Sequence, residues 1–234
     1  MRPPLPPAVT DRIRRERCAP HPSQHDYMHL RDLRAALRRT FDTIDVKEGP
    51  ALDLYCGSRP YESLLPSRPV WGFDIDRHFG GADVVGGMPL PFRDGAFALV
   101  LCTQALYLVD DAAATVSEMR RVTAVGGHAV ITLPFILRRE SPTERRYSPE
   151  ALAHLLRDWD DVAVTKLGTA ASGAALCAGQ IAAGAARRWP VTKPFLPGIA
   201  LLLNACGVVA EMVLGTFLER WPASALIVAR RPRD

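Results

Sequence analysis

The sequence lacks the cysteine patterns of a metal or disulfide protein. No cysteine pairs with another cysteine or a histidine at the spacing of a zinc site, and the five cysteines fall at irregular intervals. We therefore expect neither structural zinc nor a disulfide framework. Free thiols are typical of a reducing cytoplasm, where we place the protein. The first residues, Met1-Arg-Pro-Pro-Leu, have no apolar core, so we expect no secretory signal there.

A strong charge of either sign is also missing. Lysine and arginine number 29 against 25 aspartates and glutamates, a net charge of +4, which disfavours a polyanion-binding protein. Apolar residues make up 48% of the 234 residues, enough for a folded core. We expect a flexible arm with at most a short helix over residues 1–24, where six prolines lie, and one domain over 25–234.

Short apolar runs bounded by glycine, proline or aspartate begin near residue 50. Such runs, separated by helical stretches, predict an α/β fold with a buried parallel sheet and helices on both faces. A preceding amphipathic pattern predicts a cap helix within residues 25–48. The expected strands are Ala51–Tyr55, Val70–Phe73, Ala82–Val85, Phe97–Cys102, His128–Leu133, Val162–Leu167 and Ser224–Ala229.

Two acids lie at or near the ends of the first two of these runs. Asp53 lies near the end of the first run, before a turn containing Gly57, and the same turn is expected to open a helix over Tyr61–Leu65. Glycine lets the backbone approach a ligand closely. Asp74 ends the second run 21 residues after Asp53, and a carboxylate about 20 residues past a glycine turn can accept both ribose hydroxyls of a nucleoside.

The stretch Leu52-Asp-Leu-Tyr-Cys-Gly-Ser-Arg-Pro-Tyr61 resembles the first motif of the class I S-adenosylmethionine-dependent methyltransferases. The resemblance continues in the same order through four further stretches and covers about residues 27–170. These are Gly72-Phe-Asp74, Met88-Pro-Leu-Pro-Phe-Arg-Asp-Gly-Ala-Phe97, Val122-Thr-Ala-Val-Gly-Gly-His-Ala-Val-Ile131 and Arg146-Tyr-Ser-Pro-Glu-Ala-Leu152. It implies a Rossmann-like sheet of seven strands, one antiparallel, with the cofactor at the carboxyl ends of the strands.

Site roles follow from the resemblance. It implies that Asp53 and Gly57 line the amino-acid end of S-adenosylmethionine, with Tyr55 beside it, and that Asp74 takes the ribose hydroxyls. The remaining implied contacts are with the adenine (Ile75, Gly87, Met88) and with the methionine part (Thr103, Gln104). Two residues depart from the family: Tyr55 replaces its first glycine, and Gly87 replaces its adenine-binding acid. The ring of Tyr55 could instead face the sulfonium through a cation–π contact.

The general base is not fixed by this resemblance. The family's histidine after the fourth strand is missing, because the chain reads Leu106-Tyr-Leu108 there. We take His29 and Tyr107 as the candidate catalytic residues, with His25 and Glu140 as further candidates. Arg145 and Arg146 could bind an acidic group, but we expect them in a solvated loop. No set of acids has metal-ligand character, so we expect no metal.

The acceptor is expected to be hydrophobic. The nucleic-acid methyltransferase loop after the fourth strand is replaced by Thr103-Gln-Ala-Leu-Tyr107, so we expect no nucleic-acid partner. An apolar helical insert, residues 172–220, precedes the last strand and contains the run Leu196–Leu218. We expect this run to be a buried helix or a lid over the pocket. The alternatives are a peripheral membrane or homodimer contact, and a membrane span.

We therefore expect methyl transfer from S-adenosylmethionine, with S-adenosylhomocysteine as product, to a natural-product or lipid-like molecule by in-line displacement. Two other interpretations stay open. The chain could bind the cofactor without transferring methyl, as a cyclase or in a structural role, or it could be a membrane-docked binding module.

Overall fold

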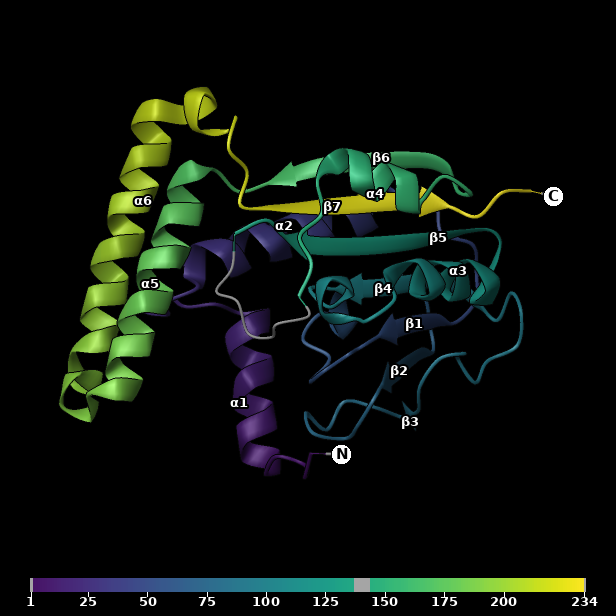
Figure 1. Ribbon diagram of the computed structural model, residues 1–234, viewed down its shortest axis with the longest axis horizontal. Coiled ribbons are helices and arrows are strands. Elements are labelled where there is room, and N and C mark those ends of the chain that lie inside the picture. Colours follow the sequence, from purple (N-terminus) through teal and green to yellow (C-terminus); the bar gives the residue numbers. More distant parts are fainter. Residues whose placement is uncertain (1, 137–143, 234) are drawn as a thin grey trace.

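The computed structural model describes residues 2–136 and 144–233 and is built around one seven-stranded sheet (Figure 1). The strands follow the order β3-β2-β1-β4-β5-β7-β6, and β7 runs antiparallel to the other six strands. All seven expected strands form, so the predicted fold class is confirmed. Their bounds are β1 Ala51–Leu54, β2 Val70–Asp74, β3 Val84–Val85, β4 Phe97–Thr103, β5 Thr123–Pro134, β6 Asp160–Leu167 and β7 Ser224–Arg230.

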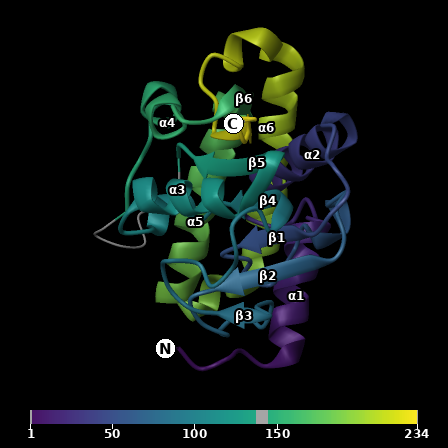
Figure 2. The same cartoon turned by 90° about the vertical axis from the view of Figure 1, so that its right-hand side faces the viewer.

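Helices cover both faces of the sheet (Figure 2). Helix α2 (Tyr27–Thr43) packs on one face, and α3 (Ala112–Val122) and α4 (Pro149–Leu155) pack on the other. Successive residues of a strand point to opposite faces. Leu52 and Leu54 belong to the core on the α3 side, so the carboxyl group of Asp53 lies on the α2 side.

Side chains cap the first turns of α3 and α4. The carboxylate of Asp111 accepts a hydrogen bond from the backbone N–H of Ala114, and the hydroxyl of Ser148 accepts one from Ala151. Each side chain satisfies a donor that the first helical turn leaves free. All five cysteines are free, in agreement with the expectation of no disulfide framework.

The helix predicted over Tyr61–Leu65 is wrong. Only one turn of 3₁₀ helix forms between β1 and β2, at Glu62–Leu64. Pro66 follows at once, and proline forces the preceding residue into an extended conformation. Leu65 accordingly has φ −66° and ψ 131°. The chain therefore turns from β1 to β2 without a full crossover helix.

The first residues contain the short helix that the prediction for this arm allowed, and they contact the domain. They contain helix α1 (Pro7–Cys18) and lie against the end of the sheet that carries the glycine turn. Arg14 donates its Nε–H to the carbonyl of Ser58 over 2.6 Å, and the N–H of Leu5 donates to the carbonyl of His78 over 2.8 Å. These contacts were not visible in the sequence because α1 has little apolar patterning.

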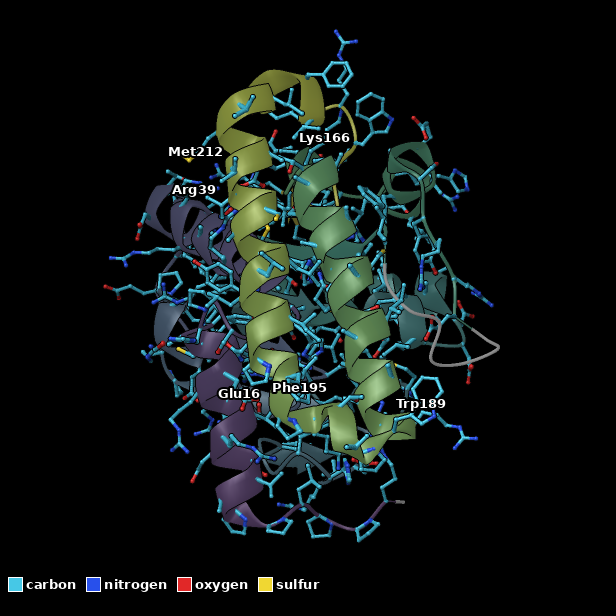
Figure 3. The ribbon with its side chains drawn as sticks, turned by 90° about the vertical axis from the view of Figure 1, so that its left-hand side faces the viewer. Glu16, Arg39, Lys166, Trp189, Phe195 and Met212 are labelled. Carbon is cyan, nitrogen blue, oxygen red and sulfur yellow. The ribbon has the colours of Figure 1, made fainter. Side chains whose placement is uncertain are left out.

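The apolar insert forms a helical hairpin at the carboxyl ends of the parallel strands (Figures 1 and 3). It consists of α5 (Ala170–Arg188), a 3₁₀ segment (Pro190–Phe195) and α6 (Leu196–Leu218). By length and composition, Pro190–Gly215 could cross a membrane. Only 17% of its most apolar window is buried inside the protein. The insert is helical as predicted, but α6 is largely exposed rather than buried.

Candidate cofactor and acceptor site

The turn after β1 keeps a left-handed backbone despite its tyrosine. Tyr55 has φ +57° and Gly57 has φ +54°. A left-handed conformation is unusual for a residue with a side chain, so Tyr55 holds this turn at a conformational cost of about 1–3 kcal/mol. Its ring packs edge-on against Phe73, with ring centroids 6.4 Å apart, and its hydroxyl forms a hydrogen bond with Thr115 of α3. The ring therefore points toward the α3 side of the sheet.

Asp74 connects this turn to the end of β2. Its Oδ2 accepts a hydrogen bond from the N–H of Gly57 over 3.0 Å, and its Oδ1 accepts one from Ile75 over 2.8 Å. Burial raises the pKa of Asp74, and these two backbone bonds oppose that rise. Each carboxylate oxygen has two lone pairs. The half-buried group therefore keeps acceptor capacity for two further donors, such as the hydroxyls of a ribose.

The surface around Asp74 can receive a flat, partly apolar ligand. A Cβ at Gly57 or Gly87 would meet no atom within 4 Å, so space is open above both backbones. Ile75 is 56% exposed and Met88 is 38% exposed. Exposed apolar side chains next to an acceptor pair suit a purine nucleoside.

Asp53 is a buried carboxyl group with an unused acceptor. It is 1% exposed, and its Oδ1 has no hydrogen-bond partner in the described structure. Burial raises the pKa of Asp53 to about 8, although the nearby Arg59 opposes the shift. An unpartnered buried acceptor is costly. A cationic N–H donor, such as the α-ammonium of an amino acid, would satisfy it.

Arg59 was part of the quoted motif but received no role from the sequence. Its side chain packs over Gly72 of β2, where a Cβ would lie 2.3 Å from Nε, and its guanidinium pairs with Asp83. Glycine at position 72 is required for this close approach. Arg59 thus brings a positive charge near the carboxyl group of Asp53.

A cavity of about 550 Å³ adjoins the carboxyl end of β4. It brings together four residues that the sequence proposed, His29, Thr103, Gln104 and Tyr107, and also His25. The other residues expected to contact the cofactor lie outside this lining: Asp53, Tyr55 and Gly57 for its amino-acid end, and Asp74, Ile75, Gly87 and Met88 for its nucleoside. Glu140 lies outside the described residues.

His29 is held inside a hydrogen-bonded chain. It is 7% exposed, its Nδ1 lies 3.3 Å from the hydroxyl oxygen of Ser224, and it forms a second side-chain hydrogen bond with Gln104. Gln104, at φ +51°, donates its Nε2–H to Thr132 over 3.2 Å. Burial lowers the pKa of His29, so its imidazole is neutral at pH 7. The chain Ser224–His29–Gln104–Thr132 fixes the glutamine at the end of β4.

Tyr107 forms part of the cavity wall beside a cation. It is 5% exposed, and the guanidinium of Arg146 lies 5.2 Å from the centre of its ring. Arg146 also pairs with Glu144 over 3.0 Å. Arg145 and Arg146 are both exposed and lie in a loop, as expected, and the guanidinium of Arg146 also packs over the ring of Tyr107.

Several cavity residues were missed by the sequence argument. Tyr61, the last residue of the quoted first motif, is 3% exposed, and burial raises its pKa to about 12. Arg17 of α1 and Gln180 of α5 also line the cavity. No motif marks Arg17 or Gln180, because they reach the site through helices outside the region of resemblance.

The described residues fit S-adenosylmethionine and offer no metal site. Among residues 2–136 and 144–233, no group of three or more histidines, cysteines, aspartates or glutamates could hold a metal ion. The vacant acceptor of Asp53, the paired oxygens of Asp74 and the open backbone at Gly57 match the ammonium, ribose and backbone approach that this cofactor requires.

Sequence comparisons agree with this geometry. The family described as methyltransferase domain matches residues 69–131. The demethylmenaquinone methyltransferase of Corynebacterium efficiens is 33% identical over 105 residues, which are 40% of this chain and 46% of that protein. The chain thus matches less than half the length of this curated relative.

Solved structures share the fold over most of the chain. The 4+2 cyclase SpnF has a TM-score of 0.58 at 18% identity, covering 89% of this chain and 83% of that one. Phosphoethanolamine N-methyltransferase 2 of Haemonchus contortus, solved with S-adenosyl-L-methionine, has a TM-score of 0.50 at 16% identity. The match covers 85% of this chain and 52% of that one. The resemblance to methyltransferases is therefore confirmed in sequence across residues 69–131, and the two solved structures share the fold over 85–89% of the chain.

Proposed function

We propose that this chain is a cytoplasmic enzyme that transfers a methyl group from S-adenosylmethionine to a hydrophobic small molecule. The observation that carries the proposal is the arrangement of Asp53 and Asp74 around the open turn at Gly57. Asp53 can bind the ammonium of the cofactor, and Asp74 can accept hydrogen bonds from its ribose hydroxyls. The cofactor, when bound, supplies a methyl group on a positively charged sulfur, which is a good electrophile.

The cavity supports an acceptor with a large apolar part. Leucines from three helices, Leu30, Leu33, Leu176 and Leu196, contribute to its wall together with Pro197. The rest of the wall is largely polar and includes the charged Glu16, Arg17 and Asp26, so the cavity suits an amphiphile whose apolar part contacts the leucines. The name of the Corynebacterium relative also supports a lipid-like quinone or a similar molecule as the acceptor.

The polar residues of the cavity would orient the acceptor rather than carry out demanding acid–base chemistry. In-line displacement at a methyl group depends mainly on the alignment of the nucleophile. We propose that His29 is a positioning residue, since both Ser224 and Gln104 engage its ring. Gln104 and Tyr107 would then contact the ligands directly, at the end of β4 and in the following turn.

The proposal is tested with methyl-labelled S-adenosylmethionine. The purified chain is incubated with labelled cofactor and either demethylated quinones or a hydrophobic extract, and the organic phase is counted. Labelled product that disappears with Asp74→Ala supports the proposal. S-adenosylhomocysteine binding without any labelled product across these acceptors would favour the other interpretation, a fold that binds the cofactor for a cyclisation or a structural role.

A further inference from the structure

We propose that the outer face of the α5–α6 hairpin docks on the surface of an anionic lipid bilayer. The hairpin would lie on the bilayer without spanning it. This inference rests on the proposed function in one respect, since it names the phase that delivers a lipid-like acceptor. Its evidence is independent of the cofactor site.

The outer face carries many exposed apolar side chains. Large apolar side chains of α6 are strongly exposed, with Met212 at 80%, Val213 at 74% and Leu202 at 66%. Further members of this face are Ile199, Leu201, Val209, Leu214 and Phe217. A monomeric protein seldom exposes so large a patch without a partner. Figure 3 shows α6 and α5 side by side on this surface of the molecule.

The charge pattern selects an anionic partner. Residues 162–210 contain no aspartate or glutamate, but they contain Lys166, Arg187, Arg188 and Lys193. Lys166 also lines a depression of about 670 Å³ with Arg39 and Arg220, beside the acids Asp32, Glu211 and Glu219. Cations near an anionic membrane each strengthen binding. A second copy of this chain would instead place these cations against one another.

Aromatic side chains stand at both ends of the outer face. Trp189 and Phe195 are 59% and 67% exposed where α5 turns into α6, and Figure 3 shows them at that end of the hairpin. Phe217 and Trp221 are 56% and 52% exposed at the other end. Tryptophan and related rings favour the boundary between headgroups and acyl chains. Glu16 of α1 lies near Phe195 in Figure 3. The carboxylate Oε1 of Glu16 lies 3.9 Å from the guanidinium Nε of Arg12.

The inner side of α6 ties the hairpin to the domain. Glu211 accepts hydrogen bonds from Arg31 and from Thr169, each over 2.8 Å. The side-chain amide of Asn204 donates to the carbonyls of Pro22 and Gln24 over 2.7 and 2.8 Å. A helix surrounded by lipid would carry Glu211 and Asn204 at high cost. The polar side therefore faces α2, and the apolar side is available to a bilayer surface.

One end of the outer face meets the cavity. Leu196 and Pro197, the first residues of α6, line the cavity next to the exposed Phe195. A molecule dissolved in the bilayer would thus reach the cavity past this end of the hairpin. The acceptor class that fits is an amphiphile that partitions into membranes.

The test is flotation of the full chain with lipid vesicles. Vesicles of phosphatidylcholine alone are compared with vesicles containing about one third phosphatidylglycerol. We expect flotation with the anionic vesicles, weakened by high salt. Val213→Glu should reduce the bound fraction about tenfold, and Lys193→Ala about fivefold. The matched control is Val125→Glu, an exposed valine of β5 outside the hairpin, which should float like the wild type.

Thermal unfolding of each variant verifies the fold, and sedimentation velocity without lipid reports the oligomeric state. No flotation with either vesicle, or equal flotation of the Val213 and Val125 variants, would overturn the inference. A dimer that Val213→Glu dissociates, without flotation, would assign the face to a second copy. Titration with S-adenosylhomocysteine in the same preparation separates the two proposals, since docking requires no cofactor.

Discussion

Replacing Asp53 by asparagine is expected to stabilise the ligand-free protein increasingly as the pH rises. The buried carboxyl group has a pKa of about 8 in the folded chain, whereas an unfolded aspartate ionises at about pH 4. Between these two values the unfolded chain has released a proton that the folded chain retains. Rising pH therefore favours unfolding of the wild type across this window, by about 1.4 kcal/mol per pH unit. Asparagine does not titrate, so the variant escapes this loss.

The assay is urea unfolding of both proteins at several values between pH 5 and pH 8. The unfolding free energy of the variant minus that of the wild type should grow by several kcal/mol over this range. In thermal unfolding the same change would correspond to a difference of roughly 10 °C in midpoint temperature. Asp94→Asn is the matched control, because that carboxylate is exposed and lies outside the site. A difference between variant and wild type that stays constant with pH would refute the buried, proton-bearing state of Asp53.

The same substitution should reduce the stabilisation that a bound ligand gives to the protein. We expect S-adenosylhomocysteine to stabilise the wild type more than Asp53→Asn, because its ammonium pairs with the ionised carboxylate. Binding near pH 7 should release a proton from the wild type only. Calorimetry in two buffers of different ionisation enthalpy measures that proton, and equal proton release by both proteins would contradict the role of Asp53.

Three further substitutions test other parts of the structure. Asp74→Ala should weaken S-adenosylhomocysteine binding by about 1–3 kcal/mol in calorimetry, because ribose hydroxyls lose their acceptors; unchanged affinity would show that the ribose acid is misplaced. His29→Phe should lower kcat about tenfold without changing cofactor affinity, and the wild-type pH–rate profile should lack a limb near the pKa of His29; such a limb would make it a base. Glu211→Ala should cost about 1–3 kcal/mol in urea unfolding, since Arg31 and Thr169 lose a partner inside the structure; no loss would mean that the contact does not hold α6.

The sheet and the turn at Gly57 could be predicted because their signals are local. Each strand is an apolar run that ends at glycine, proline or aspartate, and Asp53 and Asp74 lie at a spacing that places them on adjacent strand ends. The caps at Asp111 and Ser148 depend only on residues three positions away. Such features do not depend on which segments pack around them.

The surroundings of the site could not be predicted because they depend on contacts between distant segments. The hydrogen bond of Arg14 to Ser58 joins α1 to the glycine turn, and that of His29 to Ser224 spans most of the chain. The composition of Leu196–Leu218 indicates a membrane-compatible helix, but it cannot say which side faces α2. Glu211 and Asn204 decide this through partners on other elements.

The most direct test of the account is a crystal structure of the chain with S-adenosylhomocysteine. We expect the ribose hydroxyls within hydrogen-bonding distance of Asp74, the ammonium at Asp53 and the sulfur facing the cavity beside Gln104. Density for the purine elsewhere on the molecule, or a crevice at Gly57 occupied by the chain's own side chains, would contradict it.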